Sequence, residues 1–340
     1  MILRTLAIYF FTTFFFVKCR AIPPPPATQL SSHLVTQLPN PAWLENIAIR
    51  PNGELLLTVL KPQPILYKVI KPWDASPRVE IIYDFSSNTT VALIGITETI
   101  HDVFVLVSAA SLAGPFTAWT ADFKGKSSPQ VTKLTHLNGA KLPNGVTSLP
   151  GCPNRVLIAD SFAGLVWSLD TITQKFEIAV QVPEMSPPPN STAQGAVGIN
   201  GIKMYKGYLY WTNSMLATVY RIKIKPDGTA ERSSKAEIVA HFPVSFLDDF
   251  VINDHGILFA MASYENQIWA TSSQPGGSVT LVIGQKDQPT VSGITSGEFG
   301  RTRQDGKSLY AVTSGAGTDG KITDGLGGKV VAVDTKHFNL

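Results

Sequence analysis

Acidic and amide side chains recur at one position of a repeated sequence pattern. Each stands just before or at the start of a short apolar stretch, which is followed by a turn and a second apolar stretch. These side chains are Glu45, Asn144, Asn200 and the pair Asp248-Asp249. If the fold gathers them, carboxylates that crowd without a cation repel each other and raise their pKa values. A hard cation with oxygen ligands relieves that repulsion, and the amides supply hydrogen-bond donors.

Each residue taken alone has a simpler interpretation. Asn and Asp often begin turns and strands, because their side chains bond to nearby backbone groups. The recurrence at one phase of a repeat is what favours a functional site.

The repeat extends over nearly the whole chain of 340 residues. Its six units start about 50 residues apart, a period typical of propellers. The first two strands of the units are expected in the ranges 45–59, 92–108, 144–161, 200–214, 248–263 and 296–314. Third strands are expected at 65–70, 117–123, 166–170, 219–224, 267–271 and 329–334, and fourth strands at 79–85, 130–134, 175–180, 236–242 and 278–283.

The sixth unit has no fourth strand of its own. A spare strand near the N-terminus, residues 33–38, is expected to complete the last sheet. The sequence therefore predicts an all-β, six-bladed β-propeller of four-stranded antiparallel blades, closed by the N-terminal strand. The alternative is a pair of β-sandwiches, but no linker or shift in composition divides the chain.

The first 21 residues are typical of a secretory signal peptide. Arg4 precedes an apolar stretch that is too short to span a bilayer, and small Ala21 precedes four closely spaced prolines. A short membrane anchor is the alternative. Cleavage after Ala21 would leave residues 22–340 as one propeller domain with no membrane span, a formal charge of zero and Cys152 as its single cysteine. We expect a secreted protein, or one that passes through the secretory pathway.

Two sequons, at Asn88 and Asn190, are candidate glycosylation sites in that pathway. The chain is 44% hydrophobic and 16% charged, with no basic run, so it is a packed protein without a nucleic-acid partner. We expect a monomer that binds small apolar molecules.

Three short motifs resemble the regucalcin/gluconolactonase superfamily. They are ENIAIRPNGELLL at 45–57, NGIK at 200–203 and DDFVINDHG at 248–256. That superfamily consists of six-bladed propellers with an axial divalent metal held by Glu, Asn and Asp. The resemblance implies Glu45, Asn200 and Asp248 as ligands of Ca²⁺ or another divalent cation, and places Asn144 near the metal and substrate.

The chain resembles more closely a secreted fungal branch of that superfamily. The segments that carry this resemblance are LPNGVTSLPG at 142–151, GINGIK at 198–203 and GGKVVAV at 327–333. The branch implies a hetero-Diels–Alderase of secondary metabolism, which joins a tropolone-type quinone methide to a humulene-type sesquiterpene in meroterpenoid biosynthesis.

A cycloaddition requires two reactants held in one orientation and needs no cofactor. Donors on the diene oxygen lower its barrier, so Asn144 and Asn200 are candidate catalytic donors. Glu45 and Asp248 are candidates to assist the dehydration that releases a quinone methide. Trp43, Trp211, Asp249 and Phe250 are expected to line the apolar substrate pocket, although each aromatic also suits the core between blades.

Two other functions remain open at this point. A metal-dependent lactonase would use the same Glu45, Asn200 and Asp248, with Asp249 as the base for water. A binding propeller without catalysis would only present its loops to a partner. Residues 183–197, which interrupt the repeat, are either a lid over the site or a solvated loop.

Overall fold

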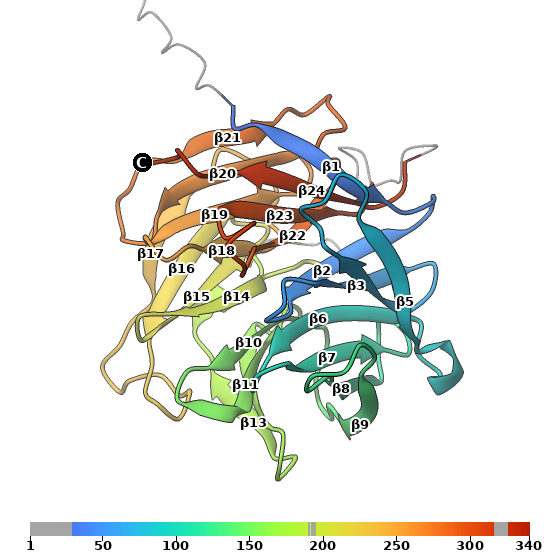
Figure 1. Ribbon diagram of the computed structural model, residues 1–340. Coiled ribbons are helices and arrows are strands. Elements are labelled where there is room, and N and C mark those ends of the chain that lie inside the picture. Colours follow the sequence, from blue (N-terminus) through green and yellow to red (C-terminus); the bar gives the residue numbers. More distant parts are fainter. Residues whose placement is uncertain (1–28, 190, 192–194, 316–325) are drawn as a thin grey trace, which may run out of the picture.

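The computed structural model describes residues 29–189, 191, 195–315 and 326–340. The predicted signal peptide, residues 1–21, and the sequon residue Asn190 lie outside the described residues. Within the described ranges the chain forms six four-stranded antiparallel sheets arranged around one centre (Figure 1). The predicted all-β, six-bladed propeller is therefore confirmed.

The first three blades follow each other in chain order. Blade 1 contains β2 (Trp43–Ile49), β3 (Leu55–Lys61), β4 (Ile65–Ile70) and β5 (Arg78–Asp84). After the short helix η1 (Ser86–Asn88), blade 2 contains β6 (Ala92–Glu98), β7 (Val103–Ala109), β8 (Phe116–Asp122) and β9 (Gln130–His136). Blade 3 contains β10 (Pro143–Leu149), β11 (Cys152–Asp160), β12 (Leu165–Asp170) and β13 (Phe176–Val180).

The other three blades complete the ring. After the short helix η2 (Pro183–Met185), blade 4 contains β14 (Ile199–Tyr205), β15 (Tyr208–Asn213), β16 (Thr218–Lys223) and β17 (Glu237–His241). Blade 5 contains β18 (Phe250–Ile252), β19 (Ile257–Ala262), β20 (Gln267–Ser272) and β21 (Thr280–Gly284). Blade 6 contains β22 (Ile294–Phe299), β23 (Ser308–Thr313), β24 (Lys329–Asp334) and, as its outer strand, β1 (Ser32–Gln37).

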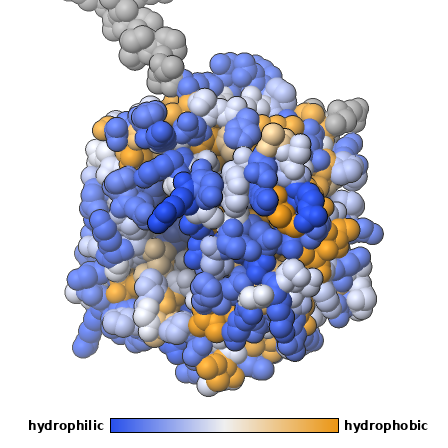
Figure 2. All heavy atoms as spheres, in the orientation of Figure 1, coloured by the Kyte–Doolittle hydropathy of each residue, from blue (hydrophilic) through white to orange (hydrophobic). Residues whose placement is uncertain are grey.

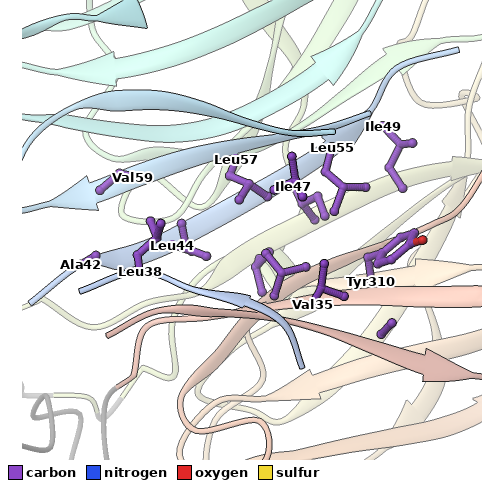
Figure 3. Close-up of a cluster of buried hydrophobic side chains, with 14 residues drawn as sticks. Val35, Leu38, Ala42, Leu44, Ile47, Ile49, Leu55, Leu57, Val59 and Tyr310 are labelled. Atoms are coloured by element: carbon purple, nitrogen blue, oxygen red, sulfur yellow. The ribbon is translucent and has the colours of Figure 1, made fainter. Parts of the chain in front are cut away.

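The N-terminal strand closes the ring, as the sequence predicts. β1 pairs antiparallel with β24, so that His33 faces Ala332 across the ladder. Apolar side chains of β1, β2, β3 and β23 then fill the space between blades 6 and 1, among them Val35, Leu44 and Tyr310 (Figure 3). The first and last parts of the chain are thus held together by backbone hydrogen bonds and by a buried apolar layer.

Glycines allow the innermost strands of neighbouring blades to approach closely. A Cβ atom at Gly145 would lie 2.6 Å from the carbonyl oxygen of Asn200, and one at Gly201 would lie 2.1 Å from Oδ1 of Asp249. Both distances are too short for a side chain. Gly therefore follows Asn in the two Asn-Gly pairs because the next blade leaves no room, and this packing places the strand-start residues of blades 3, 4 and 5 side by side.

Hydroxyl groups link the inner strands across the blade boundaries. Thr58 donates to the carbonyl of Ile94 between blades 1 and 2, at 2.7 Å. Thr212 donates to the carbonyl of Asp248 between blades 4 and 5, at 2.6 Å, and Thr295 donates to the carbonyl of Leu44 between blades 6 and 1, at 2.8 Å. These bonds fix the positions of neighbouring inner strands relative to one another along the channel axis.

The surface is mainly polar. The face shown in Figure 2 is largely hydrophilic, with hydrophobic residues scattered over it. Within the described ranges, no helix has the length and apolar character needed to cross a bilayer.

Ring closure leads to the first testable prediction. Val35→Ala removes two buried methyl groups from the layer between blades 6 and 1, and we expect it to lower the free energy of unfolding by about 2 kcal/mol. Leu34, its neighbour on β1, is mostly exposed, so Leu34→Ala should change this energy by less than about 0.5 kcal/mol. Urea unfolding of both variants measures the difference, and equal effects would contradict closure by β1.

Candidate functional site

The predicted site residues meet at one mouth of the central channel, here called the acidic mouth. Asn144 and Asn200 are the second residues of the inner strands β10 and β14, and Glu45 is the third residue of β2. Asp248 lies just before β18. All inner strands run in the same direction along the channel, as in any propeller. The fold therefore brings together side chains that are up to about 200 residues apart in the sequence.

Asn200 and Asp248 are joined directly. Nδ2 of Asn200 donates to Oδ1 of Asp248 at 2.9 Å and to the hydroxyl of Ser214 at 3.0 Å. Asn200 is buried and Asp248 is half-buried. The amide therefore holds one oxygen of Asp248 in a fixed position.

Glu45 lies at the same mouth with its carboxyl group held by a tryptophan. Nε1 of Trp43 donates to Oε2 of Glu45 at 2.7 Å. Burial raises the pKa of Glu45 to about 7, and the negative charge of Asp249 adds to this effect, while the hydrogen bond from Trp43 opposes it. Glu45 is thus a carboxyl group able to give or take a proton near neutral pH.

Asp248 is shifted in the same direction. Burial raises its pKa well above the usual range, and the charges of Glu45 and Asp249 raise it further, against the hydrogen bond from Asn200. Burial therefore shifts both carboxyl groups toward their neutral, protonated forms, and Glu45 changes between its two forms near neutral pH. Each then has an O–H that can donate a hydrogen bond to a bound molecule.

Asp249 lies one layer deeper in the channel. Its Oδ2 accepts a hydrogen bond from the hydroxyl of Ser296 at 2.6 Å, and its Oδ1 accepts one from the backbone N–H of Phe250 at 2.8 Å. Nζ of Lys203 lies 3.9 Å from Oδ2 of Asp249 and 3.8 Å from Oε2 of Glu298. Burial alone would lower the pKa of Lys203, but these two carboxylates raise it, so the lysine stays charged.

Asn144 differs from Asn200 at the corresponding position of blade 3. It is half-buried, and within the described ranges its side chain has no hydrogen-bond partner. The hydroxyl of Ser161, which corresponds to Ser214, is fully buried and likewise has no partner in the described part of the chain. The amide of Asn144 is therefore available to a ligand at the acidic mouth.

The predicted pocket aromatics occupy different places. Trp43 is half-buried at the mouth. Trp211 is fully buried and stacks on Tyr220 with ring centroids 5.5 Å apart, and Phe250 is fully buried in the cluster between blades 4 and 5. Trp211 and Phe250 have no exposed surface, so they belong to the buried core that packs against the inner strands rather than to a pocket.

Exposed apolar side chains lie at the acidic mouth in four of the six blades. In each blade the loop between the second and third strands lies at this mouth, because the end of the second strand pairs with the start of the inner strand. These loops in blades 2 to 5 carry exposed apolar residues, namely Leu112, Phe162, Met215, Leu216 and Tyr264. The mouth thus combines neutral acids and amides at its centre with an apolar rim.

Residues 183–197 lie beside this rim where they are described. Nδ2 of Asn213 donates to the carbonyls of Glu184 and Ser186, at 3.0 and 2.8 Å, and Met185 is buried among the core residues of blades 3 and 4. The start of this segment is therefore fixed against blade 4.

The predicted metal ligands are not arranged as a set of oxygen donors. Asn200 directs its Nδ2 atom toward Asp248, whereas Ca²⁺ needs oxygen ligands. In the described part of the chain, no three or more His, Cys, Asp or Glu side chains are grouped to hold a metal ion. The site as arranged fits hydrogen-bonded acids better than it fits a cation.

A cavity of about 690 Å³ lies at the opposite mouth. It is lined by the far ends of the inner strands, and none of Glu45, Asn144, Asn200 or Asp248 reaches it. Four of its charged groups form pairs: Lys203 lies near Glu298, and Arg301 is paired with Glu98. We therefore place the chemistry at the acidic mouth, where Glu45 and Asp248 form no ion pair with any of the described residues.

Two residues of the site were missed by the sequence analysis. Ser296 stands at the start of the sixth unit and is followed by Gly297, just as Asn precedes Gly in blades 3 and 4, so its position in the repeat was an available signal. Lys203 closes the motif GINGIK, but nothing in the sequence indicates that it reaches Asp249 in the next blade.

Comparison with known proteins gives two sequence relatives over most of the chain. A protein from Phoma sp, named "Putative hetero-Diels-Alderase", is 31% identical over 314 residues, which cover 83% of this chain and 86% of that protein. "Putative hetero-Diels-Alderase asR5" from Sarocladium schorii is 30% identical over 346 residues, covering 92% and 85%. No family model matches the chain.

Solved structures share the fold at low sequence identity. A luciferin-regenerating enzyme superposes with a TM-score of 0.63 at 13% identity, over 91% of this chain and 96% of that one. A calcium-binding regucalcin from Agrobacterium tumefaciens superposes with a TM-score of 0.57 at 14% identity, over 92% and 97%. These likenesses confirm the propeller and its resemblance to regucalcin.

The raised pKa of Glu45 predicts how stability changes with pH. Between about 4.5, the ordinary value, and about 7, the folded protein holds a proton that the unfolded chain has lost, so stability falls as pH rises through this range. Glu45→Gln removes that loss and keeps an acceptor for Trp43. We expect the melting temperature of the variant, relative to wild type, to increase from pH 5 to pH 8, measured with a chelator present.

Glu177→Gln is the matched control, because Glu177 lies exposed on the outer strand β13. It should follow the wild type at every pH. A constant difference between Glu45→Gln and wild type over this range would show that Glu45 titrates as an ordinary carboxyl group.

Proposed function

The chain belongs to the family of the two relatives named as hetero-Diels-Alderases, and from this we propose that it is an enzyme that catalyses a [4+2] cycloaddition. More specifically, we propose that it joins a tropolone-type quinone methide to a humulene-type sesquiterpene in fungal meroterpenoid biosynthesis. The reaction forms one C–O and one C–C bond, moves no proton and needs no cofactor.

The observation that carries this proposal is the combination found at the acidic mouth. Neutral carboxyl groups of Glu45 and Asp248 and the free amide of Asn144 lie inside a rim of apolar side chains. Apolar reactants gain from burial against such a rim, and holding them together supplies much of the rate. Hydrogen bonds from the amide or the acids to the heterodiene oxygen withdraw electron density from it and lower the barrier.

The same acids suit the step that prepares the quinone methide. A hydroxymethyl precursor becomes a quinone methide by loss of water, which requires a proton on the departing hydroxyl group. Protonated Glu45 gives that proton, and the enolic proton of the ring returns to the carboxylate, so the protein ends unchanged. Such general acid catalysis contributes about 100-fold or more.

The test uses the precursor and the preformed diene in separate reactions. With a hydroxymethyl tropolone precursor and humulene, Glu45→Gln should lower the rate of adduct formation at least about 100-fold, as measured by liquid chromatography and mass spectrometry. With a quinone methide generated chemically, the variant should keep most of the rate, because no proton moves in the cycloaddition.

The stereochemistry of the adduct provides the control for the reaction itself. The wild-type protein should give a single stereoisomer, with or without a chelator, whereas buffer gives a mixture. A mixture identical to that of buffer would refute the cycloaddition. Lactone hydrolysis that stops on chelation would favour the metal-dependent alternative instead.

We also propose that the protein is a secreted, monomeric glycoprotein. Asn88, at the end of η1, is only partly buried, and among the described residues its side chain bonds only to neighbouring Ser87, which supports glycosylation there. When the chain is expressed through a eukaryotic secretory pathway, we expect a glycosidase-sensitive mass shift that decreases in Asn88→Gln and in Asn190→Gln. A secreted protein whose mass the glycosidase leaves unchanged would contradict glycosylation at both sites.

A further inference from the structure

A stacked pair of aromatic rings stands at the acidic mouth in blade 5. The rings of Phe246 and Tyr264 have centroids 4.6 Å apart and an interplanar angle of 16°. Phe246 is half-buried, whereas Tyr264 leaves 39% of its surface exposed. The pair therefore presents aromatic surface to whatever enters the mouth.

The pair lies next to one of the two neutral acids. Phe246 is two residues before Asp248, and Tyr264 lies in the loop between β19 and β20 at the same mouth. At the high pH where a phenol ionises, burial and then the carboxylates of Asp248 and Glu265 raise the pKa of Tyr264, so both carboxyl groups lie within electrostatic reach of its ring. A molecule bound on these rings is thus close to the hydrogen-bonded pair of Asn200 and Asp248.

Hydrogen bonds on both sides hold the pair in place. Oε1 of Glu265 accepts hydrogen bonds from the backbone N–H of Ser245, at 3.0 Å, and from its hydroxyl group, so the neighbours of the two rings are joined. On the other side, the N–H of Leu247 donates to the carbonyl of Ser214 at 3.2 Å. The stack is therefore formed before any ligand arrives.

The second of these bonds also brings an aliphatic surface beside the aromatic one. Ser214 begins the loop of blade 4 that carries exposed Met215 and Leu216. Aromatic and aliphatic surfaces thus flank Asp248 from two adjacent blades. A conjugated heterodiene is planar and stacks well on aromatic rings, whereas an alkene in a flexible aliphatic ring needs only apolar contact.

We propose that Phe246 and Tyr264 form a binding platform for the planar, oxygenated conjugated reactant, with its oxygen directed toward Asp248. Met215 and Leu216 receive the aliphatic reactant. The platform itself requires only a planar conjugated ligand, while the assignment of its ligand as the diene rests on the proposed cycloaddition.

Binding without turnover tests the platform. Tropolone is the probe, and isothermal titration calorimetry measures its affinity for the intact protein. Phe246→Leu and Tyr264→Leu should each weaken binding about tenfold, whereas Tyr264→Phe, which keeps the ring, should change it less than about threefold. Ile178→Ala alters an exposed apolar residue on the outer strand β13, away from the rim, and should leave the affinity unchanged.

Two further measurements make the result specific. Cycloheptanone has the same ring size and a carbonyl group but is not planar, so it should bind more weakly and respond equally little to all four substitutions. Tyr264 lies in an exposed loop, so Tyr264→Leu should fold normally, as circular dichroism will check. Failure of wild-type protein to bind tropolone, or equal losses in Tyr264→Leu and Ile178→Ala, would overturn the platform.

The outcomes also separate the platform from the reaction. If the protein binds tropolone through these rings but forms no adduct, the binding platform is supported and the proposed cycloaddition is refuted. If Phe246→Leu protein forms the adduct with an unchanged KM for the diene, the cycloaddition is supported and the binding platform is refuted.

Discussion

Closure of the ring by the N-terminal strand is the constraint on which the rest of the structure depends. The pairing of β1 with β24 turns a linear array of sheets into a circle, and only in a circle do the starts of the inner strands face a common axis. Cys152 is a free thiol, and no disulfide occurs in the described part of the chain. Backbone ladders and apolar layers between blades therefore hold the hub together, and the site residues inherit their positions from that packing.

The sequence predicts the elements well because each has a strong local signal. β-branched and aromatic stretches separated by turn residues predict the strands, and the missing fourth strand of the last unit predicts the role of β1. The sequence has no comparable signal for the direction in which a side chain points. Asp248 and Asp249 are adjacent, yet one binds Asn200 at the mouth and the other binds Ser296 deeper in the channel. Likewise, Trp211 is core and Tyr264 is exposed, which only the packing of neighbouring blades decides.

The charges of the acidic residues in the channel depend on their depth, since Asp248 lies at the mouth and Asp249 lies deeper. In the deeper layer Asp249 has Ser296 and charged Lys203 as partners, so its negative charge is supported. Nearer the mouth, the donors that Glu45 and Asp248 find among the described residues are neutral, namely Trp43 and Asn200. Burial and the charge of Asp249 then make proton binding the least costly way to relieve repulsion there. Burial is thus the main cause of the raised pKa values of Glu45 and Asp248, and the charge of Asp249 adds to it.

Neutral acids suit the low-polarity reactants that we propose for this site. Covering a carboxylate with an apolar molecule removes water from a charge and costs several kcal/mol, whereas a protonated carboxyl group costs far less and still offers an O–H donor. The apolar rim and the raised pKa values therefore serve the same end, since each makes binding of a low-polarity reactant favourable. A hydrolase has the opposite need, because its water nucleophile must be activated by a charged base or a cation. The preference of this mouth for neutral donors is the physical reason to favour cycloaddition over lactone hydrolysis.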